Sequence, residues 1–345
     1  MKGLTKEEKR DALGAFFEIE DDRDLAVLDR SVLERWAECP WQARAIEDGR
    51  VKAVGVLAEA GEAVHVAFSR TIQSWIDSEG AMSAADLRNE AEWEMRGARP
   101  DIQPEALKGG MPALWAWSKL IADIHPGNIL RFDGGEDAGR SGQLAYDIPD
   151  LGVRVTSELD LLYASPSPEV VDEVDYKTGW KSHTVESIAS AFQFQLHALL
   201  VFENYKDVNC LRVRVLDSRA NRMSYAVPFT RNHSHSYAVR VRSAVEAYKR
   251  HHDDPPTWPT VEKCRICPAA ALCPVADEPI KPASEDVLRQ LIATEARADA
   301  LRGILTARVD ESKQDIVCGG VAFGRSKPPT KRKSPATLYD LQSEE

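Results

Sequence analysis

The chain has 345 residues, of which 43% are hydrophobic, and a formal net charge of −11. It is long enough for one large domain or two smaller ones, and apolar enough to bury a core. The N-terminus is too charged for a secretory signal and no apolar run reaches the length of a membrane helix, so we expect a soluble, cytoplasmic protein without a membrane partner. Six cysteines do not make a disulfide scaffold in a chain of this length, and their clustering favours a metal site.

The acidic balance argues at first against a nucleic-acid partner, but the charge is unevenly distributed. Residues 206–250 contain ten Lys and Arg against three Asp and Glu, and residues 325–333 contain five basic residues and no acid. A globally acidic chain with a locally basic groove can still bind phosphates. The alternative is that these residues form solvated faces of strands and helices.

The N-terminal part of the chain is predicted to be helical. Residues 1–28 form a leader, with a short helix at residues 5–17. Ser31-Val32-Leu33-Glu34 has the pattern of a capping box, so a helix is expected to begin at Val32. Pro40, directly after Cys39, predicts a kink at that point.

Two further helical stretches are predicted, at residues 51–79 and from there to about Arg131. The second stretch carries Trp93, Trp115 and Trp117. Such tryptophans either stack on unpaired bases or, more commonly, belong to a hydrophobic core.

The middle of the chain alternates strands and helices. Residues 153–163 and 170–176 are apolar runs of strand length, separated by a turn-forming Ser-Pro-Ser-Pro segment. Residues 144–148 are expected to pair with the first run as a hairpin. A helix at 186–204, a strand with one basic face at 211–216, its partner at 223–229 and a helix at 234–250 complete the segment. This order predicts a mixed α/β core.

Residues 279–345 are predicted to form a C-terminal appendage. Residues 284–309 have the pattern of an amphipathic helix. Residues 316–323 indicate a small hairpin that turns at two glycines, and the Pro- and Lys-rich tail from residue 327 is expected to be disordered.

The strongest chemical signal lies on the two apolar runs of the middle segment. Strand side chains alternate between faces, so Asp175 and Lys177 point the same way, and Asp160 can join them if the two strands are neighbours. Carboxylates suit Mg²⁺ or Mn²⁺, and the lysine would orient a metal-bound water, as in a hydrolytic phosphodiester site. Glu158 and Glu173 share faces with the two aspartates, so a one-residue shift of register would exchange their roles.

Asp160, followed by Val174-Asp175-Tyr176-Lys177-Thr178-Gly179, resembles the PD-(D/E)xK nuclease superfamily, and the second stretch is similar to the form in its RecB-like branch. The resemblance covers roughly residues 29–278 and implies a restriction-endonuclease-like fold, in which helices flank a mixed central sheet. It also implies that Asp160, Asp175 and the Tyr176 carbonyl bind the metal and that Lys177 positions the attacking water.

Two further motifs support the RecB-like branch. His65 resembles the upstream histidine that supplies a metal ligand. Gln193-Phe194-Gln195-Leu196-His197 resembles the Q-x-x-x-Y motif, which implies that Gln193 supports the site or the lysine. The chain departs from the family pattern at His197, where tyrosine is usual, and at Ser157, where glycine is common.

The cysteines indicate a second metal site. Cys264, Cys267 and Cys273 gather three thiolates on one short loop, and Cys39 would be the fourth ligand. Four thiolates hold either zinc or a [4Fe–4S] cluster. Their spacing resembles the iron–sulfur staple of CRISPR-associated RecB-family exonucleases and helicase–nuclease subunits, so we favour the cluster, which would tie the start of the domain to its end.

The sequence therefore predicts a leader at residues 1–28, a nuclease domain at 29–278 and an appendage at 279–345. The resemblance implies a metal-dependent DNA exonuclease acting on single-stranded or end-bearing DNA in recombination, repair or CRISPR-type processing, with a helicase, recombinase or CRISPR protein as a possible partner. The alternative is a non-catalytic DNA-binding or assembly subunit that keeps the fold and its metal staple.

Overall fold

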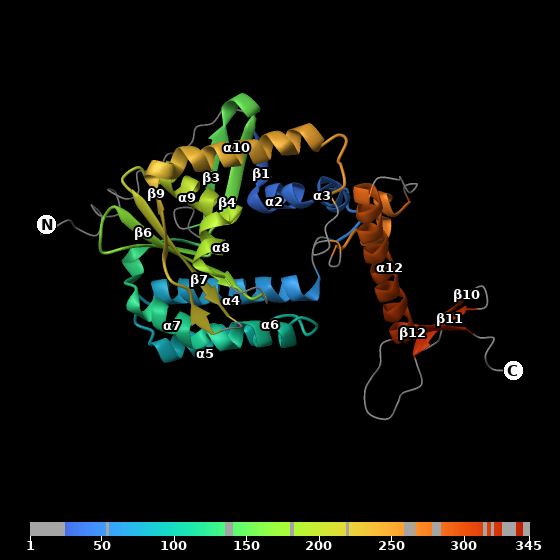
Figure 1. Ribbon diagram of the computed structural model, residues 1–345. Helices are drawn as coiled ribbons and strands as arrows, with labels where there is room; N and C mark the ends of the chain where they lie inside the picture. Colours follow the sequence, from blue (N-terminus) through green and yellow to red (C-terminus); the bar gives the residue numbers. More distant parts are fainter. Residues whose placement is uncertain are drawn as a thin grey trace, which may run out of the picture. The chain divides into compact units, whose positions relative to one another are not determined.

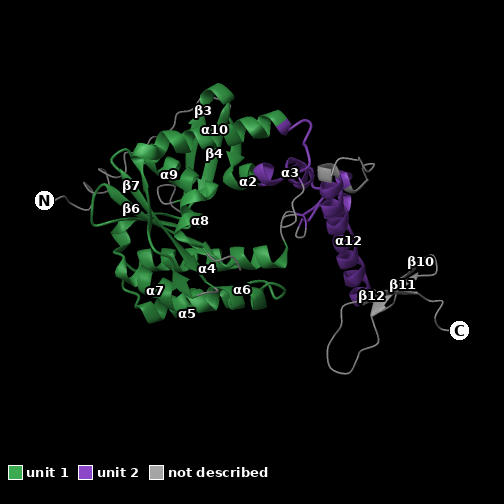
Figure 2. Ribbon diagram, in the orientation of Figure 1, with its two compact units in different colours: residues 1–34, 54–250 green, residues 35–53, 251–345 purple. Residues whose placement is uncertain are grey.

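The computed structural model describes residues 25–52, 55–134, 141–179, 183–218, 221–258, 264, 267–277, 284–312, 316–318, 321–325 and 336–340. The chain divides into two compact units (Figure 2). Unit 1 comprises residues 1–34 and 54–250, and unit 2 comprises residues 35–53 and 251–345. The helix predicted at residues 5–17 lies outside the described residues.

A six-stranded mixed sheet is the centre of unit 1 (Figure 1). Its order is β2 (Ile129–Phe132), β5 (Leu161–Ala164), β6 (Val170–Lys177) and β7 (Cys210–Asp217), with β8 (Arg222–Met223) and β9 (Val227–Thr230) both paired to β7. β6 and β7 are parallel, and the other pairs are antiparallel. The parallel pair is connected by α8 (Val185–Ser190) and α9 (Phe192–Asn204), because parallel neighbours need a crossover.

One face of this sheet is covered by a helical layer. The layer consists of α4 (Val56–Asp77), α5 (Ala84–Arg96), α6 (Gln103–Gly110) and α7 (Leu114–Asp123). Phe68 stacks on Trp117 within it and meets Tyr176 of β6 edge-on. Trp117 is therefore a core residue, whereas Trp93 and Trp115 are 69% and 60% exposed.

The opposite face of the sheet packs on α9 and shares a second core with α10 (Ser234–His251). The same core includes a three-stranded sheet in the order β1 (Ala26–Asp29), β4 (Val153–Glu158) and β3 (Gln143–Ile148). The predicted mixed α/β fold with a sheet flanked by helices is confirmed.

One predicted strand was wrong in a way that matters for the site. Residues 153–163 do not form a single strand, because β4 ends at Glu158 in the three-stranded sheet and β5 begins at Leu161 in the six-stranded one. The chain crosses between the sheets at Leu159 and Asp160. The apolar pattern continues across this break because Leu159 is itself buried.

The start of α2 (Arg30–Glu38) also differs from the prediction. The Ser31 N–H donates to Oδ1 of Asp29 at 2.8 Å, so Asp29 takes the capping role and the helix begins before Val32. The predicted break at Pro40 is confirmed, since Cys39 is extended and α3 (Pro40–Glu47) starts with proline in its first turn.

Unit 2 contains α3, the long helix α12 (Ser284–Ser312) and an antiparallel sheet of β10 (Ile316–Cys318), β11 (Val321–Arg325) and β12 (Ala336–Asp340). The predicted helix and hairpin are confirmed. The predicted disorder of the tail is wrong at β12, because β11 offers a free strand edge with which residues 336–340 pair.

Among the described helices, none is long and apolar enough to cross a membrane.

Candidate active site

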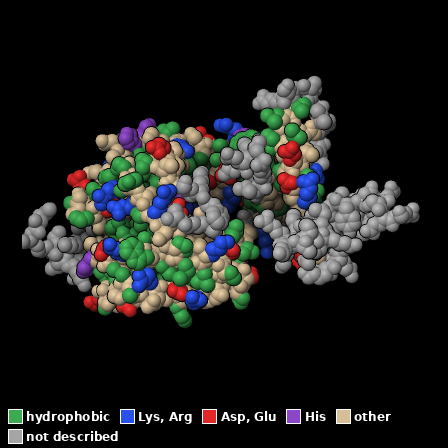
Figure 3. All heavy atoms as spheres, turned by 60° about the horizontal axis from the view of Figure 1, so that its bottom comes forward, with side chains coloured by type: hydrophobic (Ala, Val, Ile, Leu, Met, Phe, Trp, Pro, Cys, Tyr) green, Lys and Arg blue, Asp and Glu red, His purple; other side chains and the backbone are tan. Residues whose placement is uncertain are grey.

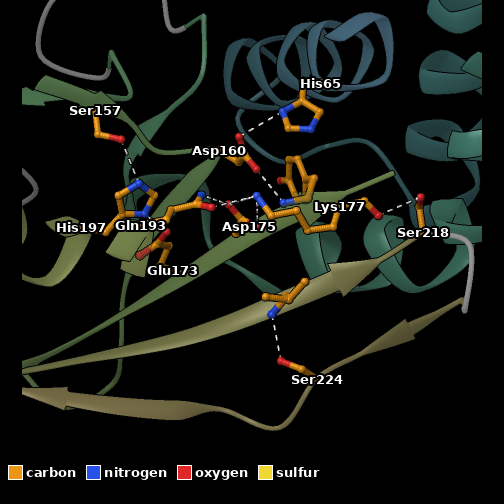
Figure 4. A network of polar contacts seen from close by, with 12 residues as sticks. His65, Ser157, Asp160, Glu173, Asp175, Lys177, Gln193, His197, Ser218 and Ser224 are labelled. Atoms are coloured by element: carbon orange, nitrogen blue, oxygen red, sulfur yellow. Dashed lines mark hydrogen bonds and ion pairs between the residues drawn. The ribbon is translucent and has the colours of Figure 1, made fainter. Parts of the chain in front are cut away.

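Asp160 lies where the chain passes from β4 to β5, and its carboxylate contacts two other elements of unit 1. The Tyr176 N–H of β6 donates to Oδ2 of Asp160 at 2.6 Å. On its other side, Oδ1 lies 3.1 Å from Nδ1 of His65 on α4. The break between the strands thus leaves the carboxylate at the edge of the six-stranded sheet, facing the helical layer (Figure 4).

Asp175 and Lys177 lie on one face of β6, and Gln193 at the start of α9 joins them (Figure 4). Nζ of Lys177 is 2.9 Å from Oδ2 of Asp175 and donates to Oε1 of Gln193 at 3.1 Å. The Gln193 amide donates in turn to Oδ1 of Asp175 at 2.6 Å. These three side chains form a closed ring of contacts. Asp175 and Lys177 share one face of β6, as expected from the alternation of side chains along a strand.

The ionised forms of Lys177, Asp160 and His65 are stabilised by their oppositely charged neighbours. Burial disfavours the charged form of Lys177, but Asp175 and Asp160 raise its pKa above the usual value, so the ammonium persists. Burial likewise opposes the charge of Asp160, yet His65 and Lys177 hold the pKa of this carboxyl at about 2. Burial would lower the pKa of His65, and the adjacent Asp160 instead raises it to about 9.

Asp133 is a residue of this site that sequence reasoning missed. It follows β2 directly, and the pairing of Phe132 with Leu161 places it next to Asp160, whose carbonyl accepts a hydrogen bond from the Asp133 N–H at 3.3 Å. Burial and the neighbouring carboxyls of Glu158 and Asp160 raise the pKa of Asp133 to about 7. The signal was an aspartate after a short apolar run, but that run was interpreted as helix.

The donor atoms fit a hard divalent cation. One nitrogen of His65 and one oxygen each from Asp133 and Asp160 all lie within 4.8 Å of one another. Carboxylate oxygens are ligands that Mg²⁺ and Mn²⁺ prefer, and the imidazole nitrogen favours Mn²⁺ over Mg²⁺. Oδ2 of Asp175 is buried, and the Lys177 ammonium lies 2.9 Å from it.

Asp175 is not part of the His65 group, because its carboxylate is held by Lys177 and Gln193. Tyr176 contributes its N–H to Asp160, and its hydroxyl accepts from the Trp117 indole at 3.2 Å. The Tyr176 carbonyl as a metal ligand stays a prediction.

The two glutamates that shared strand faces with the aspartates lie apart from the ring around Lys177. Glu158 is exposed and its Oε1 accepts from the Gly134 N–H at 3.4 Å. Glu173 is buried against His197, with 2.5 Å between Oε1 and Nδ1. His197 therefore lies behind the site and not at its surface.

The four predicted cysteine ligands are all in unit 2. Cys39, Cys264, Cys267 and Cys273 line one small cavity, together with Trp41, Trp258 and alanines of α12. Burial first, and then the three neighbouring thiols, raise the pKa of Cys267 to about 11. Among the described residues, no three of these sulfurs lie within 4.8 Å of one another. The sequence thus brings the cysteines to one cavity without packing their sulfurs tightly.

Comparison with known proteins supports the interpretation of the fold. A search of curated proteins finds no match. A family model described as the PD-(D/E)XK nuclease superfamily matches residues 30–274, a span that begins with α2 and includes His65, both aspartates of the motif, Lys177, Gln193 and all four cysteines of the cavity. The chain belongs to the PD-(D/E)XK nuclease superfamily.

Proposed function

We propose that this protein is a metal-dependent DNA exonuclease of the RecB-like type, acting in the cytoplasm on single-stranded or end-bearing DNA. The observation that carries the proposal is the convergence of Asp160, Asp175 and Lys177 at one edge of the sheet, with His65 and Gln193 in contact with them. Binding of DNA alone would need neither an ordered ring around an ammonium nor a cluster of cation ligands.

In this proposal His65, Asp160, Asp175 and the Tyr176 carbonyl bind Mg²⁺ or Mn²⁺, and Asp133 is an additional ligand. The cation supplies Lewis-acid activation of water and neutralises charge on the phosphate. Lys177 has a raised pKa and stays protonated, so it donates hydrogen bonds that orient the attacking water instead of removing its proton. Gln193 keeps the Lys177 ammonium and the Asp175 carboxylate in position through one hydrogen bond to each.

Binding of the cation is expected to release protons. In the metal-free protein, the pKa of His65 is about 9 and that of Asp133 about 7, so both are at least partly protonated near neutrality. A cation needs both groups deprotonated, so Mn²⁺ affinity should rise with pH from about 7 to about 9. Calorimetry of Mn²⁺ binding in two buffers of different ionisation enthalpy measures the released protons. An affinity that stays constant across this range would contradict the assigned ligands.

The DNA contacts are proposed from exposed aromatic and basic side chains. Trp93 and Trp115 project from the helical layer of unit 1 and could stack on unpaired bases. On the face shown in Figure 3, basic side chains are dispersed among acidic and apolar ones. Several arginines of the basic segment make intramolecular contacts, which leaves fewer of them to track phosphates; these are Arg212 with Asp172, Arg231 with carbonyls, Arg240 with Gln195, and Arg242 with Asp150.

The test of the proposed function is digestion of end-labelled DNA. Blunt, 5′-tailed and 3′-tailed duplexes and a closed circular single strand are incubated with Mn²⁺, Mg²⁺ or a chelator. Metal-dependent release of short products from the linear substrates, with the circle intact, is expected for an exonuclease. Cleavage of the circle indicates an endonuclease, and DNA binding without cleavage under any of these conditions indicates the non-catalytic alternative.

We propose that the cysteine cavity holds a [4Fe–4S] cluster. A zinc tetrahedron with bonds of about 2.3 Å brings its sulfurs to about 3.8 Å from each other. Among the described residues no three of the four sulfurs lie that close together, and it is the spacing of the cysteines in the sequence that favours the cluster over zinc. The cluster would join α3 to the segment before α12, and so hold together the parts of unit 2 that come from the two ends of the domain proposed at residues 29–278.

Loss of a cavity cysteine is expected to remove the cluster and to lower the thermal stability. Cys267→Ser, expressed and purified without oxygen, should lose the brown colour and the broad visible absorbance of the wild type, and should melt at a lower temperature because an apparent ligand free energy is lost. Cys210→Ser in β7 is the matched control and should keep the colour. A colourless wild type with stoichiometric zinc would contradict the cluster.

A partner protein is proposed on α12. Side chains along this helix remain 41–57% exposed, namely Val287, Leu288, Leu291, Leu301 and Ile304. Such side chains suit contact with another protein where they form one patch, and packing within the chain is the alternative use of this helix. A helicase, recombinase or CRISPR protein is the partner that the RecB-like resemblance implies.

A further inference from the structure

Three buried polar side chains of unit 1 form a chain of contacts behind the proposed active site. Nε2 of His197 on α9 lies 2.9 Å from Oγ of Ser157 on β4, and Nδ1 lies 2.5 Å from Oε1 of Glu173 on β6 (Figure 4). The three residues are 1%, 1% and 0% exposed, respectively. We call Ser157, His197 and Glu173 the buried relay.

The order of serine, histidine and carboxylate is that of a hydrolase triad, but burial excludes that role. A nucleophilic serine must reach an external substrate, and the exposed fraction of each relay side chain is close to zero. Oγ of Ser157 also accepts from Nε of Arg30 at 3.2 Å, so it is engaged on a second side. The relay therefore acts inside the protein.

The elements joined by the relay carry residues of the active site or lie next to one in the chain. β4 ends two residues before Asp160, Glu173 lies on the same face of β6 as Asp175 and Lys177, and His197 follows Gln193 by one turn of α9. The relay thus fixes the positions of these elements relative to one another. A buried polar group that loses its partner is costly, so the loss of one of the two relay contacts is expected to weaken the other.

Ser157 and His197 depend on each other for their buried polar atoms, because Oγ of Ser157 and Nε2 of His197 are in direct contact. The second ring nitrogen of a histidine needs a partner when it is buried. The Ser157 hydroxyl supplies that partner, and a glycine would leave the nitrogen without it.

We propose that Ser157, His197 and Glu173 are positioning residues of the nuclease site, and that Ser157 and His197 act as one interdependent pair. The proposal rests on the proposed function. A shift of α9 relative to β6 moves Gln193 away from Asp175 and Lys177, and small displacements of such groups reduce rates strongly. The relay acts on turnover through these residues without touching DNA.

The experiment is a double-mutant cycle with Ser157→Gly and His197→Tyr. Each single variant is expected to lower kcat by about 10- to 100-fold, the range seen for residues that orient metal ligands, with a much smaller change in KM for DNA. The double variant should lose about as much turnover as the more affected single variant, and not the product of the two losses, since either substitution removes the same contact. His197→Gln keeps polar ends on a smaller side chain and serves where His197→Tyr alone does not fold.

His235→Tyr, on the exposed side of α10, is the matched control and should cleave DNA like the wild type. Melting temperatures are measured for every variant. Additive losses in the cycle, or losses that only track the melting temperature, would overturn the relay as a positioning device.

Mn²⁺ binding, followed by electron paramagnetic resonance, separates this proposal from the proposed function. One outcome is that the wild type does not cleave DNA while the effects of the two substitutions on Mn²⁺ affinity are non-additive. In that case the nuclease proposal fails and the relay remains. If the wild type cleaves DNA and the single variants match it in both kcat and Mn²⁺ affinity, the relay is wrong and the proposed function stands.

Discussion

Replacing Lys177 with alanine should abolish cleavage of DNA while leaving Mn²⁺ binding intact. The ammonium lies 2.9 Å from Asp175 and is held by Gln193, where it can orient water next to the proposed cation. Loss of such a group is expected to lower kcat by about 10²- to 10⁴-fold. Cation affinity should stay the same or increase, because a positive charge beside the ligands is removed. Single-turnover digestion of end-labelled DNA and Mn²⁺ titration measure the two effects.

Lys206→Ala is the matched control for this variant. Lys206 is an exposed lysine whose ammonium is paired with Glu203, away from β6. An exposed ion pair contributes little to stability, so this variant should cleave DNA at the wild-type rate. If Lys177→Ala retains full activity, the ammonium has no part in the reaction and the assignment of this edge of the sheet as the catalytic centre is wrong.

Replacing Asp160 with asparagine should remove both cation binding and cleavage. Asparagine has the shape of aspartate and can still accept from the Tyr176 N–H, so the backbone contact at the strand break is expected to survive. The charge that binds the cation and holds His65 protonated is lost. We expect kcat to fall by at least about 10²-fold and Mn²⁺ affinity to fall by at least about tenfold.

The same variant has a signature in the metal-free protein. Because the raised pKa of His65 depends on Asp160, it should drop from about 9 when the carboxylate is neutralised, since burial then dominates. An NMR titration of the His65 ring follows this change. Asp123→Asn, at the exposed end of α7, controls for the loss of one acid. An unchanged His65 pKa would show that the carboxylate does not act on the ring.

Much of the site was predictable because its signals are local. An apolar run of strand length places Asp175 and Lys177 on one face of β6, whatever the strand pairs with. Helical spacing similarly placed His65 and Gln193 on helices, and the proline after Cys39 predicted the break before α3. Asp160 contacts His65, and Lys177 contacts Asp175 and Gln193.

Other features depend on which strands become neighbours, and the residue pattern holds no information about that. The apolar pattern predicts a single strand for β4 and β5, because Leu159 between them is buried. The pattern is the same whether these residues belong to one sheet or to two. Asp133 joins the site through the register of β2 on β5. The Ser157–His197 contact joins residues 40 positions apart, and its geometry depends on how α9 packs.

Short-range pattern was therefore sufficient for the chemical groups and for the elements that carry them, because alternation, helical spacing and capping act within a few residues. Long-range packing was needed for the strand break that brings Asp160 to His65 and Tyr176, for the additional carboxylate of Asp133 and for the buried relay. The physical reason is that hydrogen bonds and register between distant segments are settled only when two cores, one on each face of the sheet, are filled together.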